Sequence, residues 1–175
     1  RIGTATCTID GITYALVIND NGVNNLHSGP DFLRNRIWDA EVSETENGTK
    51  ITFSLFSPDG DQNYPGNADI RVSYTLTNDD EIRIDYHMNC DEDTIANFTN
   101  HAYFNLAGHA SGSAMHQKAW IDADQFTIAD QYSIPTGDLV PVKGTPMDFT
   151  SLKYIDQDIE ADYEPLKFAG GYDHS

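Results

Sequence analysis

The sequence predicts an all-β protein built from antiparallel strands. Three observations predict this class: several segments alternate apolar and polar residues with a period of two, two pairs of segments are separated by short turn sequences, and helical periodicity is nearly missing. No apolar stripe persists for three helical turns, and the chain contains no repeat, heptad or low-complexity block. Spacing alone does not decide between a sandwich and a barrel.

A first hairpin is predicted at the start of the chain. Residues 4–9 and 12–18 are rich in β-branched side chains, which favour strands. Asp10-Gly11 between them readily takes the positive φ angles of a tight turn. The two segments are therefore expected to pair as antiparallel neighbours.

A second hairpin is predicted in the middle of the chain. Residues 50–57 and 81–89 alternate apolar and polar side chains, as half-buried strands do. Residues 70–76 place Val, Tyr and Leu on one side, and the Asn78-Asp79-Asp80 turn leads from them into the 81–89 strand. These segments should form consecutive antiparallel strands.

The second half of the sequence is less regular. Residues 97–106, 119–122 and 125–129 are predicted as short strands. Residues 133–145 are predicted as a loop because two prolines and two glycines interrupt them. Residues 151–154 are predicted to form a single helical turn. No internal boundary is evident, so residues 1–175 are predicted to be a single domain.

The composition excludes some partners. With 28 Asp and Glu against 10 Lys and Arg, the net charge of −18 repels phosphate backbones and anionic lipid surfaces, so neither nucleic acid nor a membrane is an expected partner. No apolar run approaches eighteen residues and no leader pattern is present, which favours a cytoplasmic location. Cys7 and Cys90 have no Cys-x-x-Cys spacing, and whether they pair is left open.

The segment most informative about function is residues 97–108, which sets His101 among Asn, Thr, Tyr and Phe side chains. Histidine exchanges a proton near neutral pH more readily than any other side chain, and the neighbouring amides and hydroxyls can hydrogen-bond a sugar. A strand that only fills a core does not need this composition. The segment is therefore predicted to carry a proton donor.

The run Asn100-His101-Ala102-Tyr103-Phe104-Asn105-Leu106 resembles the central motif of the galactose mutarotases (aldose 1-epimerases), which carries their catalytic acid. Four more stretches resemble the same family in the same order: Arg1-Ile2-Gly3, Asn25-Leu26-His27-Ser28-Gly29, residues 57–67 (Ser-Pro-Asp-Gly-Asp-Gln-Asn-Tyr-Pro-Gly-Asn) and Gly171-Tyr172-Asp173-His174. Two departures occur, because the family usually has His-Gly-Gly at residues 27–29 and Gly-Phe where this chain has Asp31-Phe32.

The resemblance implies a large antiparallel two-sheet β-sandwich, the galactose mutarotase-like supersandwich, incomplete in this chain. Family members continue beyond the Gly-Tyr-Asp-His motif, and their catalytic glutamate lies in that continuation. Residues 1–175 are accordingly expected to be a central fragment of a larger domain and to be inactive alone. A complementary segment of the same protein is one expected partner.

The resemblance also implies roles for four residues. His101 is expected to be the catalytic acid, and Arg1, His27 and Asp173 are expected to bind the substrate. Tyr103 is expected to bind the substrate for a different reason: it lies two residues after His101, so it shares a face with His101 if the segment is extended.

The implied reaction interconverts the α and β anomers of glucose or galactose by general acid–base ring opening. No metal and no cofactor is expected, and the expected ligand is an aldohexose. Two alternatives stay open, a non-catalytic carbohydrate-binding module and an inactive fragment of a split or nicked protein. A glycosidase ranks lower because no pair of carboxylates is tied to the His101 motif. The sequence ranks neither glucose against galactose nor one oligomeric state against another.

Other acidic and histidine residues are interpreted without a functional role. Asp59 and Asp61 do not continue into a twelve-position calcium loop, and they are predicted to be solvated turn acids. His87, His109, His116 and His174 are not predicted to form a zinc site.

Overall fold

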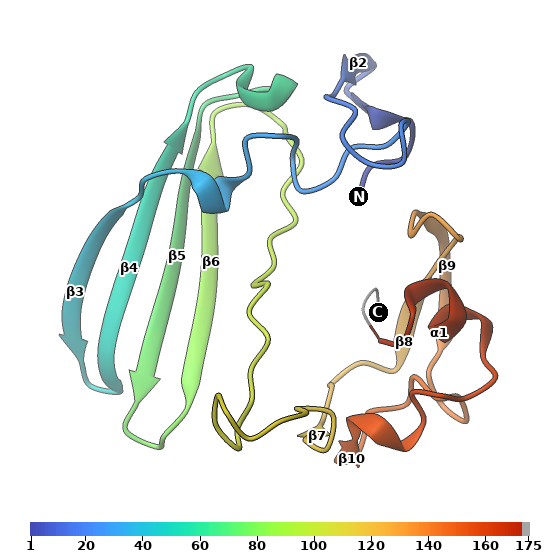
Figure 1. Ribbon diagram of the computed structural model, residues 1–175. Coiled ribbons are helices and arrows are strands. Elements are labelled where there is room, and N and C mark those ends of the chain that lie inside the picture. Colours follow the sequence, from blue (N-terminus) through green and yellow to red (C-terminus); the bar gives the residue numbers. More distant parts are fainter. Residues whose placement is uncertain (173–175) are drawn as a thin grey trace. The chain divides into compact units, whose positions relative to one another are not determined.

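The computed structural model describes residues 1–172, and its regular structure is mostly antiparallel β-sheet (Figure 1). The all-β prediction is confirmed. The chain divides into two compact units, Arg1–Thr99 and Asn100–Ser175, and each is described by itself. That residues 1–175 belong to a single domain stays a prediction.

A four-stranded sheet dominates the first unit (Figure 1). Its order is β3-β4-β5-β6, all antiparallel. The strands are β3 (Asp39–Thr45), β4 (Gly48–Ser57), β5 (Ala68–Thr77) and β6 (Ile82–Cys90). The predicted strands at 50–57, 70–76 and 81–89 are thus confirmed to within two residues at each end. The β3 strand was not predicted from the sequence.

The register of this sheet gathers its apolar side chains on one face. Phe53 of β4 lies opposite Val72 of β5, which lies opposite Tyr86 of β6. Side chains alternate between faces along a strand, so the residues between them face the other way. On that second face, the hydroxyls of Thr52 and Ser73 lie 3.0 Å apart and share a hydrogen bond. One face is therefore apolar and the other polar.

Both predicted hairpins are confirmed. β1 (Thr6–Ile9) pairs with β2 (Ile12–Ala15), and the two turn residues Asp10 and Gly11 have φ angles of 49° and 79°. Two consecutive positive φ angles match the right-handed twist of the flanking strands. The β5–β6 turn contains Asp80 at a φ of 62°, and the Thr77 hydroxyl accepts hydrogen bonds from the N–H groups of Asp79 and Glu81.

The second unit contains two small sheets and one helix. β7 (Lys118–Ala119) pairs with β10 (Lys153–Tyr154), β8 (Gln125–Ala129) pairs with β9 (Pro135–Pro141), and α1 spans Glu164–Ala169. Val142, Met147 and Leu166 form its buried core, against which Phe126 and Tyr172 pack. Single turns of 3₁₀ helix in the two units are η1 (Gly3–Ala5), η2 (Leu33–Asn35), η3 (Asp61–Asn63) and η4 (Ile155–Gln157).

Several predictions for the second half of the sequence are wrong. Residues 133–145 were predicted as a loop, but Pro135 and Pro141 lie at the two ends of β9, where a missing N–H disturbs the ladder least. Residues 151–154 end in strand β10, and the helical turn follows as η4. The predicted strand at 119–122 is reduced to β7, whereas the one at 125–129 is confirmed as β8.

The predicted strand at 97–106 is also wrong, because these residues adopt no regular secondary structure. Side chains bond to the backbone here. The N–H of Ala102 donates to Asn100 Oδ1 at 2.8 Å, and the N–H of Leu106 donates to Gln117 Oε1 at 2.7 Å. Asn side chains that bond their own backbone compete with strand pairing.

Within residues 1–172, no helix has the length and apolar character needed to cross a lipid bilayer.

The start of β4 gives a test of the sheet. Gly48 is buried at a φ of 133°, and a Cβ there would lie 2.0 Å from the carbonyl oxygen of Leu76 in β5. We expect Gly48→Ala to lower the free energy of unfolding by about 3 kcal/mol, because backbone must move in addition to the φ strain. Urea denaturation followed by circular dichroism measures this.

Gly11→Ala is the matched control. Gly11 also has a positive φ, of 79°, but a Cβ there meets nothing within 4 Å. Its cost should be about 1 kcal/mol, from the backbone conformation only. Equal losses for the two variants would show that Gly48 does not limit the approach of β4 to β5.

Candidate functional site

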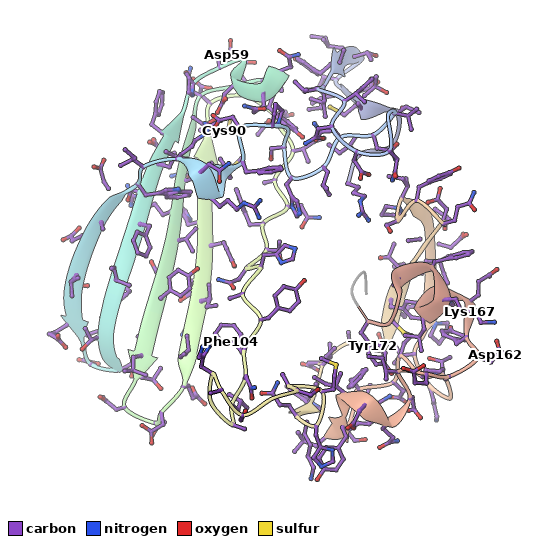
Figure 2. The ribbon with its side chains drawn as sticks, in the orientation of Figure 1. Asp59, Cys90, Phe104, Asp162, Lys167 and Tyr172 are labelled. Atoms are coloured by element: carbon purple, nitrogen blue, oxygen red, sulfur yellow. The ribbon has the colours of Figure 1, made fainter. Side chains whose placement is uncertain are left out.

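A cavity of ≈ 350 Å³ lies within the first unit. Its walls come from the N-terminal segment, the loop that follows Asn25, the turn between β4 and β5, and residues 94–99. The lining side chains that carry polar groups are Arg1, Asn25, His27, Ser28, Arg36, Ser57, Asp61, Gln62, Tyr64, Thr94, Asn97 and Thr99. Figure 2 shows Asp59 and Cys90 at the end of the sheet to which this turn belongs.

Two predicted substrate-binding residues, Arg1 and His27, line this cavity together. Ile2 and Asn25 form an antiparallel bridge, with N–H to oxygen distances of 2.9 Å and 3.0 Å, so the two segments are held side by side. Arg1 Nε lies 3.2 Å from Asp20 Oδ2, which holds the guanidinium at the cavity wall. The structure therefore joins two residues that lie 26 positions apart in the sequence.

The loop of His27 has an unusual backbone. His27 and Ser28 have φ angles of 51° and 68°, and Gly29 has 121°. Ser28 thus occupies a left-handed conformation that glycine takes at lower cost. A Cβ on Gly29 would lie 2.4 Å from Gln62 Oε1, so this loop approaches the β4–β5 turn closely. The His27 ring meets Phe32 edge-on, with the ring centroids 5.8 Å apart.

Asn25 is a buried residue of the cavity wall. It is 1% exposed, its amide donates to the Val17 carbonyl at 2.8 Å, and its Oδ1 accepts from the Tyr64 hydroxyl at 3.3 Å. Burial raises the pKa of the Tyr64 phenol, which keeps that hydroxyl protonated as a donor. A buried amide with these partners fixes its surroundings in one arrangement.

An ion-pair network centred on Arg36 also lines the cavity. The Arg36 guanidinium binds Asp61 with both terminal nitrogens, of which Nη2 lies 2.9 Å from Oδ1. Nη2 also lies 2.8 Å from Asp31 Oδ2, and the Ser57 hydroxyl donates to Asp61. Hydrogen bonds from Arg36 lower the pKa of Asp61 below its ordinary value, more than partial burial raises it.

The prediction that Asp61 is a solvated turn acid is therefore wrong, since its side chain is only 16% exposed and fully bonded. Its burial follows from tertiary contacts that a local pattern does not reveal. Asp59 is exposed, and its Oδ1 accepts the Gly66 N–H at 2.8 Å, as a turn acid does.

His101 and Tyr103 belong to the second unit. Their rings lie 5.4 Å apart at an interplanar angle of 57°, and both side chains are exposed. The structure thus brings these two predicted residues together, although not on a strand. The fifth predicted residue, Asp173, lies outside the described residues.

Among residues 1–172, no three His, Cys, Asp or Glu side chains gather as ligands for a metal ion.

Sequence reasoning missed Asn25, Arg36, Asp61 and Tyr64 as cavity residues. Three of them lie in stretches that resemble the family motifs, so their polar side chains within those stretches were the available signal. Arg36 lies in no such stretch. Its carboxylate partner Asp61 is 25 residues away, and only the folded chain shows the pair.

Comparisons with known proteins cover the whole chain. Residues 1–175 match the family model described as Aldose 1-epimerase. The chain is 40% identical over 175 residues to aldose 1-epimerase of Escherichia coli (strain K12), covering 100% of this chain and 49% of that protein. It is 42% identical over 148 residues to galactose mutarotase of Sus scrofa, covering 85% of this chain and 42% of that protein.

A solved structure shows the same fold. The galactose 1-epimerase from Lactobacillus acidophilus NCFM superposes with a TM-score of 0.82 at 26% identity, covering 97% of this chain and 49% of the other. The prediction of a galactose mutarotase-like antiparallel sandwich is thereby confirmed. The chain spans about half the length of the curated relatives it matches.

Asp61 gives a pH-dependent test. We expect Asp61→Asn to lower the free energy of unfolding by about 2 kcal/mol at pH 7, because Arg36 loses a charged partner in a partly buried place. The pKa of Asp61 is lower in the folded state than in the unfolded chain, where it is about 3.9. Its contribution is therefore complete above that unfolded value and disappears as the pH falls through the folded one.

The measurement is urea denaturation of both proteins at pH 7 and at several values below about 4. The difference between them should shrink steadily in the acidic range. Asp85→Asn is the control, because Asp85 pairs with Arg83 at an exposed site and should change stability by less than about 0.5 kcal/mol. A difference between Asp61→Asn and the parent that is independent of pH would contradict the assignment.

Proposed function

Because the chain belongs to the aldose 1-epimerase family, we propose that the whole protein interconverts the α and β anomers of an aldohexose such as galactose or glucose. The observation that carries the proposal is the cavity that Arg1 and His27 both line. Both are positions that match the family's motifs, and the cavity is lined with groups that donate and accept hydrogen bonds, as a ligand rich in hydroxyls requires.

The reaction needs two proton transfers. As the bond between the anomeric carbon and the ring oxygen breaks, the ring oxygen gains a proton and the anomeric hydroxyl loses one. The resulting aldehyde rotates about one carbon–carbon bond and closes from the other face by the reverse transfers. No oxidation state changes, so an acid and a base supplied by side chains suffice.

We assign the acid to His101, on the strength of its place in the Asn-His-x-Tyr-Phe-Asn-Leu motif. In its protonated form it would donate to the ring oxygen and recover the proton on closure. The base would be the glutamate that family members carry beyond the Gly-Tyr-Asp-His motif. The chain of residues 1–175 would then contain one of the two catalytic groups.

The remaining predicted residues would bind and orient the sugar. Arg1 and His27 would donate hydrogen bonds to hydroxyls, and Asp173 would accept them. Tyr103 would lie under the sugar ring. Its side chain is 79% exposed and its ring lies near that of His101, so it is available for such a contact.

We also infer a cytoplasmic location. Cys7 and Cys90 are both free thiols, which suits a reducing compartment.

One test compares the chain of residues 1–175 with the whole protein. We expect residues 1–175 to accelerate the decay of optical rotation of fresh α-glucose or α-galactose no more than buffer does, because the base is missing. The whole protein should accelerate it. Polarimetry measures both. Catalysis by residues 1–175 would show that the base is assigned wrongly, and a whole protein that binds galactose without accelerating the decay would be a carbohydrate-binding module.

A second test replaces the acid. His101→Asn in the whole protein should lower kcat by a factor of about 10² to 10⁴, the contribution of one positioned acid. Sugar binding should persist, since the cavity that contains Arg1 and His27 is unchanged. His109→Asn, at an exposed position in the same unit, is the control and should leave the rate unaltered. If His101→Asn retains activity within a few-fold of the parent, His101 is not the acid.

A further inference from the structure

We propose that Arg36 is a positioning residue that holds the loop of His27 against the turn between β4 and β5. The inference rests on the proposed function, in which His27 binds the sugar. Arg36 acts by binding one carboxylate from each side, Asp31 from the loop and Asp61 from the turn. Its role would be to fix the position of the His27 ring in the cavity wall.

The contacts of Arg36 span both segments. Its two terminal nitrogens bind Asp61, and Nη2 also lies 2.8 Å from Asp31 Oδ2 and 3.3 Å from the Asp31 carbonyl oxygen. The Arg36 and Asp61 side chains are 14% and 16% exposed, so solvent screens that pair little, whereas the pair with the more exposed Asp31 is screened more. A guanidinium is planar and can donate hydrogen bonds to two carboxylates in fixed directions. A lysine ammonium is a compact point charge without this fixed geometry.

In the turn between β4 and β5, Asp61 and the nearby Asn63 are bonded to other parts of the unit. The Ser57 hydroxyl, at the end of β4, donates to Asp61. Asn63, two residues later, donates from its side chain to the Ala15 carbonyl at 2.8 Å. Asp61 is thus tied to two other parts of the unit, and it can act as the fixed end against which the loop is placed.

In the loop, Asp31 is connected to His27 through its neighbour Phe32. Asp31 is followed by Phe32, whose ring meets the His27 ring edge-on. On the other flank, Gly29 lies against Gln62, the neighbour of Asp61. The His27 loop is therefore held against the turn at two places, and a change at Asp31 is transmitted through Phe32 to His27.

Within residues 1–172, Arg36 forms its bonds through its terminal nitrogens and not through Nε. Its Nε is buried and has no hydrogen-bond partner among the residues that the structure describes. An unsatisfied buried donor carries a free-energy cost. The terminal nitrogens, by contrast, both bind carboxylate oxygens of Asp31 or Asp61. Lysine would keep the charge and avoid this cost, but it would not hold both carboxylates.

The test is a double-mutant cycle in the whole protein with Arg36→Lys, His27→Asn and the double variant, read by polarimetry. Arg36→Lys should raise KM about ten-fold and change kcat by less than about three-fold, because it displaces a binding group. In the His27→Asn background, Arg36→Lys should change kcat/KM by less than about two-fold, because residues that act as a unit are not additive. Effects that multiply independently would overturn the inference.

Arg83→Lys is the matched control, since Arg83 also binds an aspartate, Asp85, but on an exposed strand surface. It should leave KM and kcat unchanged. If Arg36→Lys does not fold, Asp31→Asn replaces it, because Asp31 has a 57% exposed side chain and the Arg36–Asp61 pair stays intact. Asp31→Asn should raise KM about three-fold. An unchanged KM would overturn the inference.

The outcomes separate the two proposals. A parent protein without mutarotase activity would overturn the proposed function and this inference with it. An active parent in which His27→Asn lowers kcat/KM, but in which Arg36→Lys acts independently of His27, would overturn the inference and leave the proposed function standing.

Discussion

The antiparallel register between β4 and β5 is the constraint on which the first unit depends. It runs over ten pairs, from Gly48–Thr77 to Ser57–Ala68. A slip by one residue would turn the apolar face of the sheet toward the polar side. The last pair also fixes the two ends of the connecting segment, residues 58–67. This segment is far longer than a tight hairpin turn. Those additional residues supply Asp61, Gln62 and Tyr64 to the cavity, so the register determines where the cavity wall stands.

The charges of the cavity are paired within a strongly acidic chain. The net charge is −18, yet Arg1 binds Asp20, and Arg36 binds Asp31 and Asp61. Without Arg36 those two carboxylates would repel each other across the junction of loop and turn. These two guanidinium groups and three carboxylates leave an excess of one negative charge beside a wall that offers directed hydrogen bonds. Such a wall suits a neutral ligand rich in hydroxyls better than an anion, which supports the proposed sugar substrate.

The features that could be predicted from the sequence are those set by neighbouring residues. Asp10-Gly11 encodes its own turn, and β4, β5 and β6 show the alternation of half-buried strands. β3 escaped prediction because it is an edge strand, mostly exposed and rich in polar residues. β9 was not predicted because the prolines at its two ends are typical of loops. In the site, motif order gave Arg1 and His27, but the partnership of Arg36 with Asp61 exists only in the folded chain.

The segment of His101 is held in a different way from the cavity. A residue inside a sheet shares in the stability of its whole ladder, whereas residues 100–106 depend on individual side chains. Gln117 supplies two of these contacts, since its Oε1 accepts the Leu106 N–H and its Nε2 donates to the Phe104 carbonyl at 2.9 Å. The Gln117 carbonyl in turn accepts the Ile155 N–H at 3.0 Å, which joins this support to η4. A catalytic acid must be held within about 0.5 Å of its working position. No strand pairing supplies that precision in this segment, so side-chain bonds such as those of Gln117 and of Asn100, whose Oδ1 accepts the Ala102 N–H, have to contribute to it.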